Sequence, residues 1–170
     1  MQRDKAKKLG AGATYLAALL GLGAVGFAFL PLLRVNTVEG SRLYFTSWKL
    51  FFGGEDLFDV SGTTYGFNYS INIYLLIMLQ LFVLGALSTG LGRRSIRNLI
   101  FGLILYSGGF IFGCLVPLFV HLTNPGIDLH GLGLSYGFFL MAGSLLLAIA
   151  LTISSLVISL RYRSYLNNER

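Results

Sequence analysis

Charged residues are scarce in this sequence, and four long stretches contain none. Only 12% of the 170 residues are charged, whereas 55% are hydrophobic, so the chain carries about half the charge of an ordinary soluble domain. This composition argues against a water-soluble fold. The uncharged stretches also lack histidine, and they cover residues 10–33, 71–91, 99–120 and 132–160.

Each of these stretches is long enough for one membrane-spanning helix, because a bilayer core about 30 Å thick needs roughly 20 apolar residues. We therefore predict an all-α membrane protein, a single domain over residues 1–170 in which four transmembrane helices form a bundle. Outer loops at 34–70 and 121–131 and an inner loop at 92–98 join the spans in this prediction. The fourth stretch is longer than a span needs, so we expect it to tilt or to begin as an interfacial turn near 131–135.

The sequence also lacks the residues that most membrane chemistry requires. Cys114 is the only cysteine, which excludes an intramolecular disulfide and leaves a thiol relay without a resolving partner. No ionisable side chain lies within the four stretches, although transporters driven by ions or protons usually carry one there. His121, Asp128 and His130 share one outer loop with a turn sequence, and we interpret them as loop residues, not metal ligands. We expect no enzyme activity, no cofactor and no metal site.

Positive charge is distributed unevenly between the two sides of the predicted bundle. Because cytoplasmic loops retain Lys and Arg, the side that holds most of them is predicted to be the inside. Ten of the thirteen lie there, before the first span, between the second and third, and after the fourth: Arg3, Lys5, Lys7, Lys8, Arg93, Arg94, Arg97, Arg161, Arg163 and Arg170. We therefore predict a multi-pass protein of the plasma membrane with both termini in the cytoplasm. The basic residues suit the anionic inner leaflet of the bilayer better than nucleic acid, because they form short juxtamembrane clusters.

Small residues recur at helical spacing within the spans. In lipid, helices associate through close packing of small residues and through interhelical hydrogen bonds. Ala17 and Gly21 in the first span, and Gly109 and Gly113 in the third, are candidates for helix packing or for an oligomer contact.

Two polar residues, Gln80 and Tyr106, are candidates for an intramembrane polar contact. Interhelical hydrogen bonding is the simpler role for both of them. A pocket lined by these two residues and Tyr15 would instead indicate a substrate path.

Outer loop 34–70 is too long to be a simple connection and is rich in aromatic residues. Residues 41–52 fit a short interfacial helix or a strand, and residues 58–60 and 65–69 flank a turn and fit a hairpin. Some of these aromatic residues fit a belt of side chains at the membrane–water interface. The remainder could cap the bundle or bind a partner, and the candidate partner surface comprises Trp48, Phe51, Phe52, Glu55 and Asp56.

Two functional hypotheses follow from this sequence. The first is a non-enzymatic interaction protein, an accessory or scaffolding subunit that binds a membrane protein partner or forms a homo-oligomer. The alternative is a component of a transporter or channel for a neutral or lipophilic substrate. We favour the first, because spans without charge offer a solute little to bind.

Overall fold

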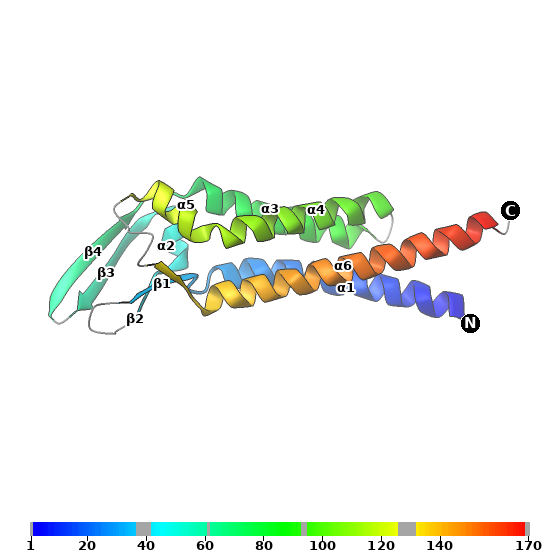
Figure 1. The fold of residues 1–170 in the computed structure, drawn as a ribbon, viewed down its shortest axis with the longest axis horizontal. Coiled ribbons are helices and arrows are strands. Elements are labelled where there is room, and N and C mark those ends of the chain that lie inside the picture. The colour runs from blue at the N-terminus through cyan, green and yellow to red at the C-terminus, as the bar shows by residue number, and fades with distance from the viewer. Residues whose placement is uncertain (1, 37–41, 61, 93–94, 126–131, 169–170) are drawn as a thin grey trace.

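The fold is a bundle of four long helices with a small cap of strands at one end. The computed structural model describes residues 2–36, 42–60, 62–92, 95–125 and 132–168. The long helices are α1 (Gln2–Ala28), α3 (Ile73–Leu91), α4 (Ile96–Cys114) and α6 (Tyr136–Asn168), and they run along the long axis of the molecule (Figure 1). Helix α1 packs against α3 and α6, and α4 packs against the same two helices. All four are long and apolar enough to cross a membrane, which fits a multi-pass membrane protein.

Prolines set two of the helix ends. The first span was predicted to reach residue 33, but α1 ends at Ala28 and residues from Leu33 onward form a strand. The physical reason is Pro31, which disfavours helical conformation in the residue before it and has no N–H to donate. In the third span, helix α4 ends at Cys114 and a short helix α5 (Val116–Thr123) follows with Pro117 in its first turn. The third predicted span is therefore interrupted beside Pro117.

The prediction of an all-α fold is wrong at the cap, which contains two small antiparallel sheets. One has the strand order β2-β1-β5, and the other is the hairpin β3-β4. The elements of the cap are β1 (Leu33–Asn36), β2 (Arg42–Tyr44), α2 (Ser47–Phe52), β3 (Gly54–Val60), β4 (Thr63–Tyr69) and β5 (Leu132–Leu134). The expected hairpin is confirmed and is longer than expected.

The beginning of the predicted fourth span forms strand β5 and not helix or turn. Leu134 pairs with Leu33, and Leu132 pairs with Val35. Backbone N–H and C=O groups need partners, and β1 supplies them from a part of the chain about a hundred residues earlier. Helix α6 then begins at Tyr136, where the backbone N–H groups of Ser135 and Gly137 donate to the carbonyls of Leu32 and Pro31.

The bundle interior is closely packed around Tyr106 of α4. This side chain has no exposed surface, and its hydroxyl donates a hydrogen bond of 3.0 Å to the carbonyl of Ala17 on α1. Gly21 of α1 and Gly85 of α3 make room for the ring, since a Cβ atom would lie 2.1 Å from Tyr106 Oη at the first and 2.7 Å from Tyr106 Cδ1 at the second. One aromatic residue therefore joins three helices.

Hydroxyl groups tie α1 to α6. The Oγ1 of Thr14 and the Oγ of Ser155 are 2.7 Å apart, and the Ser155 hydroxyl also donates to the carbonyl of Gly10. Further along the helices, the Ser144 hydroxyl donates to the carbonyl of Leu20 at 2.7 Å. These are the interhelical hydrogen bonds that stabilise helix pairs in lipid.

Candidate functional site

The small residues singled out in the sequence lie at contacts within the chain. Ala17 and Gly21 are buried. A Cβ at Gly109 would lie 2.6 Å from the Phe82 ring, and one at Gly113 would lie 3.0 Å from the Met141 Cε. These four positions serve helix packing inside this bundle.

The two candidates for an intramembrane polar contact lie in different environments. Tyr106 is buried in the bundle interior, whereas Gln80 is exposed on the surface of α3. Tyr15 is also largely exposed, on α1. The three residues therefore do not line one pocket.

In the part of the chain that the structure describes, no group of three or more His, Cys, Asp or Glu side chains could hold a metal ion. His121 lies in α5. Asp128 and His130 fall outside the described residues.

An aromatic core holds the cap together. Phe45, directly after β2, is buried and contacts three rings of the hairpin edge to face. Its centroid lies 5.8 Å from that of Phe58 and 5.9 Å from those of Phe67 and Tyr69. Edge-to-face pairs of this kind contribute about 0.5–1.5 kcal/mol each beyond burial. The hairpin is therefore anchored to the rest of the cap through one face.

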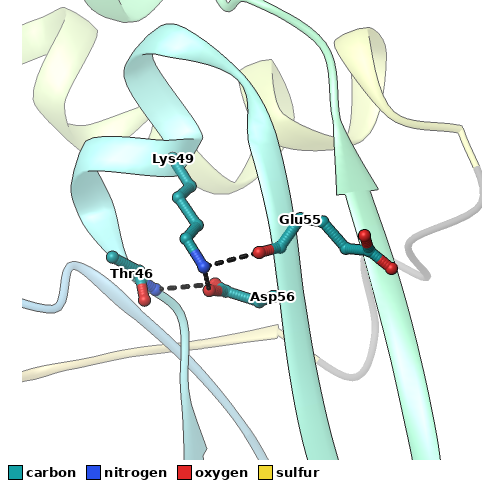
Figure 2. Close-up of polar contacts among 4 residues, drawn as sticks. All are labelled: Thr46, Lys49, Glu55 and Asp56. Carbon is teal, nitrogen blue, oxygen red and sulfur yellow. Dashed lines mark hydrogen bonds and ion pairs between the residues drawn. The ribbon is translucent and has the colours of Figure 1, made fainter.

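A partly buried ion pair fixes the same face of the hairpin to α2 (Figure 2). The Nζ of Lys49 lies 2.7 Å from Oδ1 of Asp56, and the Asp56 Oδ2 accepts a hydrogen bond of 3.1 Å from the backbone N–H of Thr46. Lys49 also donates to the backbone carbonyl of Glu55, while the Glu55 carboxylate points away from this cluster (Figure 2). Asp56 is only 5% exposed, so its carboxylate serves the cap from inside.

Tyr69 lies beside this cluster on the buried face. Burial raises the pKa of its hydroxyl, and the nearby Asp56 carboxylate raises that pKa further. The ionised form of Tyr69 is therefore disfavoured in the folded cap.

The opposite face of the hairpin is exposed and has an apolar centre between acidic residues. Leu57 is 65% exposed and pairs with Gly66 across the strands. Its neighbours on the same face are two cross-strand pairs, Glu55 with Asn68 and Asp59 with Thr64. We call these six exposed residues the hairpin outer face: Glu55, Leu57, Asp59, Thr64, Gly66 and Asn68.

Helix α2 presents a second exposed group, which is aromatic. Phe51 is buried, whereas Trp48 and Phe52 are 57% and 40% exposed, and their ring centroids are 4.2 Å apart. Phe29, just past the end of α1, lies 5.9 Å from the Trp48 ring. The Ser47 hydroxyl holds α2 in place by accepting from the Leu32 N–H and donating to the Leu30 carbonyl.

The candidate partner surface is therefore divided by the structure. Trp48, Phe52 and Glu55 are exposed, and Phe51 and Asp56 are buried. Leu57 was not predicted as part of this surface, although the alternation of residues along a strand would have placed it there. Adjacent residues of a strand point to opposite faces, so Glu55 groups with Leu57 and not with Asp56.

Comparison with known proteins does not assign this chain to a family. The sequence matches no protein-family model and no curated protein.

Proposed function

We propose that this chain is a non-enzymatic membrane interaction protein, an accessory or scaffolding subunit that docks a membrane protein partner through the hairpin outer face. The observation that carries the proposal is the exposed Leu57 between Glu55 and Asp59. An apolar centre with a polar rim is the usual composition of a protein docking site. The acidic rim favours a partner segment that carries Lys or Arg.

The orientation proposed with this function puts both termini in the cytoplasm of a cell at its plasma membrane. Two observations support it. The N and C ends of the chain lie at the same end of the bundle, opposite the cap (Figure 1), and ten of the thirteen Lys and Arg residues belong to that end by sequence. Retention of basic residues on the cytoplasmic side leaves the cap outside.

The packing of the bundle favours an interaction role over transport. Tyr106 fills the space between Gly21 and Gly85, and Gln80 lies on the outer surface of α3. A transporter or channel component for a neutral or lipophilic substrate would need this interior to open. That alternative predicts a small molecule or lipid retained by the purified chain.

Purification in gentle detergent from membranes of the native host tests the proposal. Wild type should recover a protein partner in fixed ratio, and Leu57→Ser combined with Asp59→Lys should lose it while the fold is kept. Thr63→Lys is the matched control, because Thr63 is exposed at the hairpin turn but is not part of the hairpin outer face. Equal recovery with both variants would contradict docking at this face. A chain that carries only a bound small molecule would favour the transport alternative.

A further inference from the structure

The cap end of the bundle is surrounded by exposed aromatic side chains. Among the Tyr and Trp residues whose side-chain exposure the structure describes, five are exposed, and four of these lie at the cap end, whereas Tyr15 does not. Trp48 belongs to the α2 group, Tyr44 pairs edge-on with Tyr136 at 6.1 Å, and Tyr74 stacks on Phe119 at 4.8 Å. These three groups belong to different elements, the first to α2, the second to β2 and α6, and the third to α3 and α5.

The helices that carry residues of these groups also lie close together along the long axis. Helices α2 and α5, strand β1 and the cap-end termini of α3 and α6 gather at the same position on the long axis, and β3 and β4 extend beyond them (Figure 1). Tyr and Trp are enriched at membrane–water interfaces, where their apolar rings and polar groups fit the headgroup region. A ring of such residues at one level is typical of that boundary.

The α2 group continues a lipid-facing stripe of α1. Tyr15, Leu19, Leu22, Gly26 and Phe29 are all exposed, and their spacing of three or four residues puts them on one face of the helix. Phe29 at the end of this stripe contacts both Trp48 and Phe51. The exposed rings of α2 therefore extend an apolar surface that runs along the cap-side part of a candidate membrane span.

From these observations we infer that Trp48 and Phe52 of α2 bind the outer headgroup region of the phospholipid bilayer, so that α2 is an interfacial anchor and not a protein docking site. The hydrogen bonds of Ser47 fix α2 to the segment that joins α1 to β1, and the Lys49–Asp56 ion pair fixes it to the hairpin. Anchoring α2 therefore sets the position of the hairpin outer face above the membrane. This inference extends the proposed function, but it is tested at Trp48 and not at Leu57, so either can fail alone.

Trp48 is the only tryptophan of the chain, which makes its fluorescence a direct probe of depth. The full chain would be reconstituted in phosphatidylcholine vesicles, with lipids brominated near the ester end or near the methyl end of the acyl chains. We expect the first lipid to quench most of the Trp48 emission, the second to quench less, and aqueous iodide to have little effect. Leu57→Trp in a Trp48→Phe background is the matched control, and its emission should respond to iodide and not to brominated lipid.

A second probe, Phe52→Trp in the Trp48→Phe background, should behave as Trp48 does and covers the case in which one variant folds poorly. Iodide quenching of Trp48 as strong as that at position 57 would overturn the inference. Stronger quenching by the lipid brominated near the methyl end would also overturn it, because the ring would then lie in the hydrocarbon core. Protection from both iodide and brominated lipid would overturn it in favour of contact with a second copy of the chain.

Discussion

Replacing Gly21 with alanine is expected to destabilise the bundle, although alanine is the better helix former. The added Cβ would lie 2.1 Å from Tyr106 Oη and 2.6 Å from two ring carbons of the same residue. The ring cannot retreat toward α3, because it already lies so close to Gly85 that a Cβ there would be 2.7 Å away. Overpacking of a closely packed interior typically costs about 1–3 kcal/mol.

A matched variant on the same helix removes the contribution of helix propensity. A Cβ at Gly12 would meet nothing within 4 Å, so Gly12→Ala should be neutral or stabilising by about 0.5–1 kcal/mol. Gly21→Ala should therefore lower the free energy of unfolding by about 1–3 kcal/mol relative to Gly12→Ala. The assay is reversible unfolding by sodium dodecyl sulfate in mixed micelles, followed by far-ultraviolet circular dichroism.

Tyr106→Phe tests whether the close contact with the Tyr106 hydroxyl, and not another effect of Gly21→Ala, causes the loss of stability. Alone, it removes one interhelical hydrogen bond, which is worth about 0.6 kcal/mol and at most about 1.7 kcal/mol. Combined with Gly21→Ala, it removes the 2.1 Å contact and leaves the two contacts of 2.6 Å with ring carbons. Because part of the close contact is relieved, the double variant should be more stable than the sum of the two single changes predicts. Equal stability of Gly21→Ala and Gly12→Ala, or strict additivity in the cycle, would refute the packing described around Tyr106.

Three further predictions concern the cap and the α1–α6 contact. Asp56→Ala should destabilise the cap by about 1–3 kcal/mol, because the Thr46 N–H loses its acceptor and Lys49 loses its ion pair. Faster amide exchange in the hairpin with unchanged exchange in the four long helices would show this effect, and equal exchange throughout would contradict it. The pKa of Tyr69 is raised in the folded cap, so the stability of the cap should be retained below the ordinary tyrosine pKa of about 10 and should fall as the pH rises above it. Tyr69→Phe should weaken that decline. An alkaline stability profile that this variant leaves unaltered would contradict the role given to Tyr69. Ser155→Ala removes the interhelical contacts with Thr14 and with the Gly10 carbonyl, so in the same micelle assay it should cost about 0.6 kcal/mol and at most about 1.7 kcal/mol for each contact; a larger loss would mean that these contacts have another role.

The four long helices could be predicted from the sequence because one physical requirement determines them. A span must be apolar over roughly 20 residues, and the stretch at 71–91 corresponds closely to α3 (Ile73–Leu91). The break between α4 and α5 also has a cause within the third stretch itself, because Pro117 lies in the first turn of α5.

The cap could be predicted only in part, because its sheets depend on contacts between distant residues. The hairpin β3-β4 is local, and its turn residues and alternation made it visible. The pairing of β1 with β5 joins Leu33 to Leu134, and both are leucines within stretches that resemble membrane spans. Hydropathy cannot distinguish a short buried strand from the end of a helix.

The candidate site was predicted as a region but not as a surface. Adjacent residues such as Glu55 and Asp56 were grouped by their charge, whereas the hairpin directs one outward and pairs the other with Lys49. The exposure of Leu57 and the burial of Phe51 depend on which face packs against Phe45 and the bundle. Those contacts form only after the cap has folded.

Photocrosslinking at single positions tests the central claim, docking at the hairpin outer face, most directly. A photoreactive amino acid would replace Leu57, Glu55 or Asn68 in cells of the native host, with the exposed positions Leu118 and Leu147 of the bundle surface as controls. We predict one crosslinked product of the same mass from all three hairpin positions and none from the two controls. Crosslinking to protein only from Leu118 of α5 or Leu147 of α6, with none from the hairpin, would contradict the account and assign partner binding to those helices.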